Sequence, residues 1–284
     1  MKSLREILLD SEAYLRRHDI ESARIEAEWL IGHALGLGRM DLYLQFDRPL
    51  APAELNRIRP VLKRRAQSEP VQYICGATEF YNCSIQVGPG VLVPRPETER
   101  LVEIAVEQYD GCGAILDLCT GSGAILFALA KTLADPPAMT GTDLSTAALR
   151  WAGRNQEALG LDRIEFLQGD LYEPVHDRTF GLIIANPPYV SPEEYERLGE
   201  DIRNYEPREA LVANDDGQAV LHRIAESATA HLVDDGVLIC EIGETQSQRT
   251  IELFAAHGLR NPQVFQDYND RDRVVVGRAW RRAG

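Results

Sequence analysis

The chain has 284 residues, 44% of them hydrophobic and 26% charged, a composition that indicates a globular protein and excludes a disordered or fibrous one. It carries 30 Lys and Arg against 44 Asp and Glu, a formal net charge of −14. This balance argues against a large non-specific nucleic-acid footprint, because such a footprint needs clustered positive charge, although a local basic patch is compatible with it. An acidic surface would tolerate a basic protein partner. The length suffices for one large domain and a smaller one.

Cysteine usage and the apolar runs indicate the compartment. The five cysteines form no Cys-x-x-Cys pair and no spacing typical of metal ligands, and an odd number fits poorly with a disulfide framework. We therefore expect reduced thiols and no metal site. No apolar stretch approaches the ~20 residues of a membrane span. The acid Glu6 stands where a signal peptide would begin its apolar region. The sequence predicts a cytoplasmic protein that does not associate with membranes.

Residues 1–69 predict a small N-terminal helical domain. Ser3 and Glu6 have the spacing of a capping box, and leucines follow on one helical face. A third helix is expected to begin at Pro52, because proline is well tolerated in a first turn. The domain shows no catalytic constellation, so we expect it to recognise a partner or to cover a site.

Residues 70–96 are expected to form a β-hairpin linker. Two extended segments, 78–81 and 84–87, flank a turn at 82–83. The segment then reaches Arg95, which stands between two prolines and is held rigidly. Two interpretations of Arg95 are open at this point: it is aimed at a ligand, or it is a solvated arginine in a turn.

Strands and helices alternate over residues 97–284, a pattern typical of a mostly parallel sheet covered by helices on both faces. A buried strand over 114–118 leads into a glycine turn, 120–123, that opens a helix. Glycines there let the backbone approach a ligand closely at a helix N-terminus. A dinucleotide-binding fingerprint would have a third glycine where Leu126 stands. The turn therefore resembles a loop that binds S-adenosylmethionine more than a pyrophosphate cradle.

Acidic residues follow the next two strands. Asp143 comes 20 residues after Gly123, where a carboxylate is well placed to accept hydrogen bonds from both hydroxyls of a ribose. It could instead cap the helix that begins near Ser145. Asp170 ends the third strand and could accept from an adenine amino group while Leu171 packs on the ring. The alternative for Asp170 is a plain turn acid.

The fourth strand, 180–185, runs into Asn186, Pro187, Pro188 and Tyr189. The prolines end the strand, because they donate no backbone N–H, and they stiffen a loop at the carboxyl edge of the sheet. The Asn186 oxygen and a proline-flanked carbonyl can accept both N–H bonds of a planar amino group, as in a carboxamide or nucleobase, and Tyr189 can cover its flat face. Such an amino group is a poor nucleophile, so it must be held close to a strong electrophile. The alternative is a strand-ending turn with a packed tyrosine.

The polar stretch 190–217 is too long for a simple connection, and we interpret it as a substrate-side insertion. Two late strands, around 264–265 and 273–276, are expected to complete the sheet.

Taken together, these residues resemble the release factor glutamine methyltransferases of the PrmC (HemK) family. The matching motifs follow one another in a highly specific order: Ser22-Ala23-Arg24 with Glu28, Gln72-Tyr73-Ile74 with Gly76, Glu79-Phe80-Tyr81, Val93 to Glu99, the glycine turn, Asn186 to Tyr189, and Glu206-Pro207 with Ala210-Leu211. The resemblance implies a class I S-adenosylmethionine-dependent methyltransferase fold, α/β and Rossmann-like, with an N-terminal helical domain. It implies methyl transfer from S-adenosylmethionine to the glutamine side-chain amide in the Gly-Gly-Gln motif of peptide-chain release factors. These release factors would be the partners, with no direct binding of nucleic acid.

Carried over by position, the resemblance implies two groups of site residues. The cofactor-binding group is Asp117, Cys119, Thr120, Gly121, Ser122, Gly123, Asp143, Asp170, Leu171 and Asn186. The catalytic group, which would hold the substrate glutamine, is Asn186, Pro187, Pro188 and Tyr189. Departures from the family pattern are Cys119 in place of a glycine, Leu171 in place of a frequent aromatic residue, and Asn269-Asp270 in place of a glycine-containing turn.

Other functions are compatible with parts of the sequence. The same clamp would serve an adenine amino group, so a nucleic-acid methyltransferase is an alternative, against which the acidic net charge counts. A glutamine methyltransferase of a large-subunit ribosomal protein is closer still, and only the N-terminal pattern argues against it. The chain could also be an inactive module that binds release factors, against which the intact glycine turn and Asn186 argue.

Overall fold

The computed structural model describes residues 1–280, which fall into two compact units. The helical unit consists of Met1–Ala77 together with Gly199–Tyr205. The sheet unit consists of Thr78–Leu198 and the described residues from Glu206 onward. These units do not follow the contiguous ranges expected from the sequence, because a short segment from the predicted insertion belongs with the N-terminal helices.

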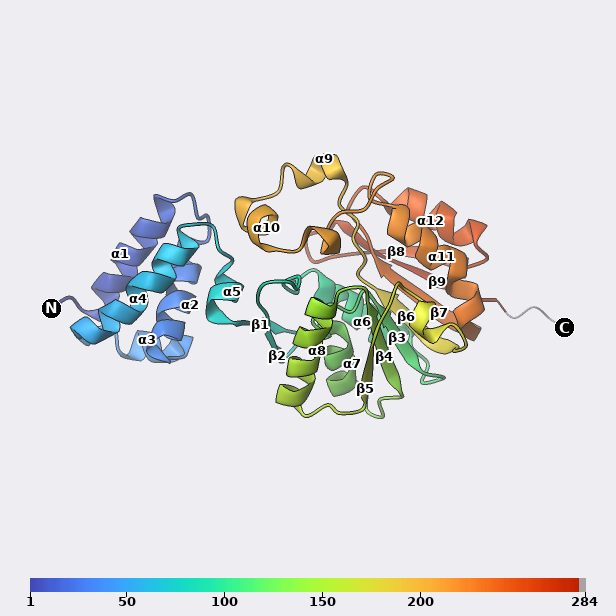
Figure 1. Cartoon of the computed structure of the whole chain (residues 1–284), viewed down its shortest axis with the longest axis horizontal. Helices are drawn as coiled ribbons and strands as arrows, with labels where there is room; N and C mark the ends of the chain where they lie inside the picture. Colours follow the sequence, from blue (N-terminus) through green and yellow to red (C-terminus); the bar gives the residue numbers. More distant parts are fainter. Residues whose placement is uncertain (281–284) are drawn as a thin grey trace. The chain divides into compact units, whose positions relative to one another are not determined.

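The helical unit is built mostly from helices that follow one another along the chain (Figure 1). They are α1 (Leu4–Arg16), α2 (Ala23–Leu35), α3 (Arg39–Leu44), α4 (Pro52–Arg65) and α5 (Val71–Cys75). The predicted capping box is confirmed, since the Glu6 backbone N–H donates to Ser3 Oγ and the Glu6 carboxylate accepts from the Ser3 N–H at 2.7 Å. Helix α5 lies where the sequence indicated only a hairpin linker. Leu4, Leu8 and Leu15 of α1 are fully buried in the core of this unit.

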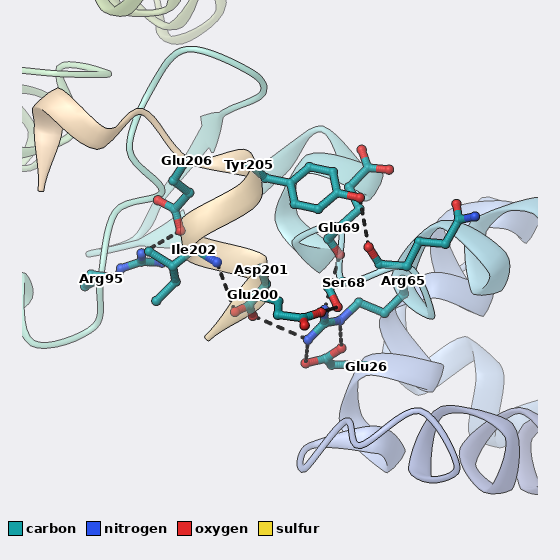
Figure 2. Close-up of polar contacts among 11 residues, drawn as sticks. Glu26, Arg65, Ser68, Glu69, Arg95, Glu200, Asp201, Ile202, Tyr205 and Glu206 are labelled. Atoms are coloured by element: carbon teal, nitrogen blue, oxygen red, sulfur yellow. Dashed lines mark hydrogen bonds and ion pairs between the residues drawn. The ribbon is translucent and has the colours of Figure 1, made fainter. Parts of the chain in front are cut away.

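Helix α10 (Glu200–Tyr205) joins this unit from far along the chain. Figure 2 shows the Tyr205 hydroxyl directed at the loop after α4, where it donates to the Gln67 carbonyl at 2.8 Å. In the same contact between α10 and the loop after α4, Ser68 Oγ donates to a carboxylate oxygen of Glu200 at 3.1 Å. No residue of α10 is buried. A helix without a buried face needs no apolar periodicity in its sequence, and that periodicity is the signal from which a helix and its packing are predicted.

A two-stranded hairpin, β1 (Ala77–Phe80) and β2 (Cys83–Gln86), comes one residue earlier than predicted. Its turn is formed by Tyr81 and Asn82, whose φ angles are 45° and 61°. Two-residue hairpin turns with φ above zero at both positions match the right-handed twist of the strands. The backbone geometry of the turn therefore sets which residues of β1 and β2 pair. The presence of Asn82 in the sequence did not by itself reveal this pairing.

The sheet unit contains a seven-stranded sheet of order β5-β4-β3-β6-β7-β9-β8 (Figure 1). Its strands are β3 (Ile115–Leu118), β4 (Met139–Asp143), β5 (Ile164–Gln168), β6 (Phe180–Ala185), β7 (Leu232–Glu241), β8 (Arg260–Gln266) and β9 (Asp272–Arg278). The first five pair in parallel, and β9 is antiparallel to both β7 and β8. The predicted mostly parallel sheet and its two late strands are confirmed.

Helices cover both faces of this sheet, as expected. They are α6 (Thr98–Gln108), α7 (Ala124–Thr132), α8 (Thr146–Leu159), α11 (Ala219–His231) and α12 (Ser247–Ala256). One face, which includes Leu116, Ile183 and Leu238, packs with apolar side chains of α11 and α12 into one core cluster. Residues that alternate with these on the strands, such as Ile115 and Ile184, are also fully buried. Burial on both faces explains why the strands are continuously apolar.

The remaining short elements lie in the connections of the sheet unit. They are the 3₁₀ turns η1 (Glu173–Val175) and η2 (Arg208–Ala210) and the helix α9 (Pro192–Tyr195). Within residues 1–280, no helix is both long enough and apolar enough to cross a membrane.

Candidate active site

A cavity of about 680 Å³ opens at the carboxyl edge of the parallel strands, inside the sheet unit. Its size falls within the range of ligand pockets, about 300–1,000 Å³. The predicted site residues that line it are Cys119, Thr120, Gly121, Ser122, Asp143, Asp170, Leu171, Asn186 and Pro188. Pro187 and Tyr189, together with Asn186, line a much smaller neighbouring cavity. Asp117 and Gly123 line neither cavity: Gly123 is the last residue of the glycine turn, and Asp117 lies on β3 just before it.

The strand register explains why residues far apart in the sequence meet here. Leu118 at the end of β3 pairs with Thr142 on one side and with Ala185 on the other. The next residues along the three strands, Cys119, Asp143 and Asn186, therefore emerge at the same level of the sheet edge. Ligands of open parallel sheets bind at this edge.

The glycine turn between β3 and α7 is shaped by backbone conformations that favour glycine. Gly121 and Gly123 have φ angles of 57° and 79°. A Cβ at Gly121 would meet no atom closer than 4.0 Å, so the backbone there is open to the cavity. Asn155, which is fully buried, donates from its side chain to the Ser122 carbonyl at 3.1 Å and so braces the turn from behind.

Asp143 is fixed by the backbone of that turn. One carboxylate oxygen accepts from the Gly121 N–H at 2.8 Å and the other accepts from the Ser145 N–H at 2.8 Å. Ser145, and not Asp143, caps α8, since its hydroxyl accepts from the Ala148 N–H. Burial raises the pKa of Asp143, and these two backbone bonds oppose the shift. A carboxylate has about four lone-pair positions, so Asp143 keeps acceptor capacity toward the cavity.

Asp117 is a fully buried acid at the end of β3. One of its oxygens accepts from the Thr120 hydroxyl at 2.6 Å. The other, Oδ1, has no hydrogen-bond partner among residues 1–280. Burial raises the pKa of this carboxyl to about 8. A buried acceptor without a partner is costly, so this position suits a ligand that brings an N–H donor or a positive charge.

Asp170 lines the cavity but is already engaged, because Arg223 donates to its Oδ2 at 2.8 Å. The neighbouring Leu171 has a φ angle of 51° and is buried, and its carbonyl accepts from the Thr142 hydroxyl at 2.9 Å. Contacts of this pair with an adenine ring stay a prediction.

Directly after β6, the strand next to β3, Asn186 is held by a residue of α6. Its Nδ2 donates to Thr98 Oγ1 at 3.1 Å, which leaves its Oδ1 as the acceptor that is not turned to Thr98. Tyr189 is turned toward the protein, since its hydroxyl donates to a carboxylate oxygen of Glu241 at 3.1 Å. A covering role for Tyr189 over a bound amino group stays a prediction.

Arg95 lines the cavity, and part of its guanidinium is engaged by the protein itself. Its guanidinium donates to Glu206 at 2.6 Å (Figure 2), and Glu206 also accepts from the Val93 N–H at 3.0 Å. The Glu206 side chain is only 1% exposed. The arginine therefore fastens the segment that follows the hairpin to the end of the insertion. Its side chain remains 29% exposed, and contact with a ligand stays a prediction.

Comparisons with known proteins place this geometry in a family. The model of the PrmC N-terminal domain matches residues 6–76, and that of the methyltransferase small domain matches residues 98–203. The release factor glutamine methyltransferase of Geobacter sulfurreducens is 40% identical over 276 residues, which cover 97% of this chain and 96% of that protein. The release factor glutamine methyltransferase of Thermodesulfovibrio yellowstonii is 37% identical, covering 88% and 91%. The chain belongs to the release factor glutamine methyltransferase family.

A solved structure agrees on the fold. The 16S rRNA N2 G1207 methyltransferase of T. thermophilus, in complex with AdoMet and guanosine, aligns with a TM-score of 0.53 and 17% identity, over 72% of this chain and 49% of that one. The expected methyltransferase fold and the expected enzyme class are confirmed.

The residues that depart from the family pattern include three with positive φ angles. Cys119 has a φ angle of 59°, Leu171 of 51° and Asp270 of 58°. All three are in the left-handed region, which L side chains adopt at a cost and glycine adopts freely. Family members with glycine at the first position, or in the turn that holds Asp270, thus avoid a strain that this methyltransferase tolerates.

Sequence reasoning missed several residues of the site. Thr98, Asn155 and Glu241 contact predicted site residues, but none lies in a stretch that indicates chemistry by itself. A signal for Glu241 existed: an acid at the end of an apolar strand is unusual, and β7 pairs with the strand that carries Asn186.

Proposed function

We propose that this methyltransferase transfers a methyl group from S-adenosylmethionine to the side-chain amide nitrogen of the glutamine in the Gly-Gly-Gln motif of peptide-chain release factors, in the cytoplasm. The observation that carries the proposal is that one cavity joins the glycine turn to Asn186. One end has the donors and acceptors that a nucleoside-containing cofactor needs, and the other presents an amide acceptor to a substrate.

The residues at the glycine turn fit S-adenosylmethionine. The unpartnered Oδ1 of Asp117 suits an ammonium group of the cofactor's methionine part. Gly121 leaves room for close approach of the backbone, and Asp143 is preorganised by two backbone N–H groups to accept from ribose hydroxyls. Asp170 and Leu171 would flank the adenine. When bound, the cofactor supplies a methyl group on a sulfonium, which is a strong electrophile.

The amide end supplies orientation. The Asn186 side-chain oxygen and the Pro187 carbonyl are proposed to accept the two N–H bonds of the substrate carboxamide, so that its nitrogen faces the methyl group. The N–C bond would form as the cofactor's C–S bond breaks, and the positive charge would pass from sulfur to the amide nitrogen. The Asn186 oxygen is proposed to stabilise that charge. The extra proton then leaves to water, and no general base is required before the attack.

The helical unit, which matches the PrmC N-terminal domain, is proposed to recognise the release factor. The formal charge of −14 would favour basic surface on that partner.

The test is transfer of labelled methyl from S-adenosylmethionine to a purified release factor, beside a release factor whose Gly-Gly-Gln glutamine is replaced by alanine. Label that depends on this glutamine is the expected result. Equal label on both proteins, or label on ribosomal protein or RNA but not on the release factor, would contradict the proposal.

A further inference from the structure

We propose that the carboxylate of Glu241, acting through the Thr98 hydroxyl, fixes which end of the Asn186 carboxamide faces the substrate. The inference rests on the proposed function, because it concerns how that site presents an acceptor to a substrate amide. Glu241 and Thr98 are positioning residues here, since neither is assigned contact with the reacting atoms.

The fold brings these residues together behind the cavity. Glu241 ends β7, and its neighbour Cys240 pairs with Ala185 at the end of β6. Glu241 and Asn186 therefore emerge side by side from adjacent parallel strands. Thr98 opens α6 and is 3% exposed, and Glu241 is 1% exposed. Water is thus largely excluded from the contact between them.

Two hydrogen bonds and one close approach connect the buried carboxylate to the amide. Asn186 Nδ2 donates to Thr98 Oγ1 at 3.1 Å, and the Thr98 side chain lies close enough to Glu241 to lower the pKa of that carboxyl. The Tyr189 hydroxyl donates to Glu241 Oε1 at 3.1 Å. The other carboxylate oxygen, Oε2, has no hydrogen-bond partner within residues 1–280, so it is available to accept the Thr98 proton.

The polarity of this chain decides the orientation of the amide. A threonine hydroxyl can either donate to a carboxamide oxygen or accept from its nitrogen, so Thr98 alone would allow both orientations of Asn186. An ionised carboxylate only accepts. Once the Thr98 proton is directed to Glu241, the Thr98 hydroxyl can only accept a hydrogen bond from Asn186. The Asn186 NH₂ group must then be the group that faces Thr98. The Asn186 oxygen is then left for the substrate N–H.

The reversed orientation would defeat catalysis. It would present the Asn186 NH₂ group to a substrate NH₂ group, so that two donors would meet and the charge developing on the nitrogen would face a positive dipole. A protonated Glu241 would permit this reversal, because it can itself donate to Thr98.

Protonation of Glu241 lies within reach of physiological pH. Burial raises its pKa to about 7, against hydrogen bonds from Thr98 and Tyr189 and the charge of Arg273 on β9, while Glu97 adds to the rise. Since the ionised form prevails above that pKa, the correctly oriented fraction of Asn186 should increase as the pH rises through about 7. Lower pH should favour the reversed amide.

The experiment compares Thr98→Val and Thr98→Ser with a matched control, Thr140→Val, in methyl transfer to a release factor. Thr140 is equally buried on β4 and makes only a long contact to Glu165, at 3.4 Å. Thr98→Val should lower kcat about tenfold, the loss of one oriented hydrogen bond, with the dissociation constant of S-adenosylmethionine unchanged. Thr98→Ser, which keeps the hydroxyl, should restore most of the rate.

Glu241→Gln supplies a second readout that a purely structural role would not move. It keeps the shape but can donate as well as accept, so kcat should fall and the rise of kcat near pH 7 should disappear. Thr98→Val behaving like Thr140→Val, or an unchanged pH profile in Glu241→Gln, would overturn the inference while an active wild-type enzyme upholds the proposed function. A wild-type enzyme that does not label the glutamine would overturn both.

Discussion

The two ends of the cavity are built in different ways. The proposed cofactor end comes from residues at the ends of β3, β4 and β5 that follow one another in chain order. Two of its carboxylates are held by near neighbours: Asp143 by backbone N–H groups, and Asp117 by the Thr120 hydroxyl. The proposed amide end is assembled from β6, α6 and β7, which are joined by contacts between side chains far apart in the sequence. Spacing along the chain therefore reveals the first end, and only the fold reveals how the second is oriented.

The largest effect that would sharpen this comparison is expected at Asp143. Asp143→Ala removes the proposed ribose acceptor and leaves the Gly121 N–H without a partner, so we expect affinity for S-adenosylmethionine to fall about 100-fold or more. Asp143→Asn keeps one side-chain carbonyl oxygen as an acceptor, so it should lose less affinity for S-adenosylmethionine than Asp143→Ala. Isothermal titration calorimetry checks this, with circular dichroism to show that the variants fold. Wild-type affinity in Asp143→Ala would mean that the cofactor is held elsewhere.

Glu206→Gln tests the fastening of the segment before α6. The variant keeps an acceptor for the Val93 N–H but removes the charge paired with Arg95, and we expect unfolding of the protein to cost about 2 kcal/mol less. Glu165→Gln is the control, because the Glu165–Arg178 pair is nearly half exposed and such pairs contribute about 0–1 kcal/mol. Denaturant titration measures both. Equal losses of unfolding free energy in Glu206→Gln and Glu165→Gln would show that the burial of Glu206 adds nothing to the contribution of its ion pair.

Asp117 predicts a pH dependence of stability in the cofactor-free protein. Its pKa is raised by burial from 3.8 to about 8, so the folded state retains a proton that the unfolded state has released, and this stabilisation is lost as pH rises between those values. Asp117→Asn cannot ionise. Its stability relative to wild type should therefore increase from pH 4 to pH 8; a one-unit difference in pKa between the states is worth about 1.4 kcal/mol. A stability difference between Asp117→Asn and wild type that stays constant with pH would contradict a pKa of Asp117 that is raised by burial.

The smallest effect is expected at Cys119. Cys119→Gly relieves a left-handed conformation at φ 59° but gives up the packing of the side chain against the core and adds freedom to the unfolded chain. These terms offset one another, so the free energy of unfolding should change by less than about 1 kcal/mol. Thermal and denaturant melts measure it. A loss of several kcal/mol would show that the thiol itself is required.

Much of the fold could be predicted from local pattern. The apolar strands, the glycine turn and the two prolines after Asn186 each act through near neighbours in the sequence, and they indicated the parallel sheet and the edge at which the site lies. The hairpin was predicted one residue late, because φ angles of the turn are not visible in residue types such as Tyr81.

Other features could not be predicted, because they depend on long-range contacts. Helix α10 has no buried residue, and its place with the N-terminal helices rests on polar contacts such as Tyr205 to Gln67. Arg95 is paired with a carboxylate 111 residues away. Thr98 and Glu241 gain their roles only from the register of β6 and β7 and from the start of α6.

The most direct test of the central claim, that one cavity holds the cofactor at one end and orients a glutamine amide at the other, is single-turnover methyl transfer by Asn186→Ala together with calorimetry of S-adenosylmethionine binding. We predict a rate about 100- to 1,000-fold below wild type, with cofactor affinity unchanged. An unchanged rate, or a loss of affinity as large as the loss of rate, would contradict the separation of the two ends.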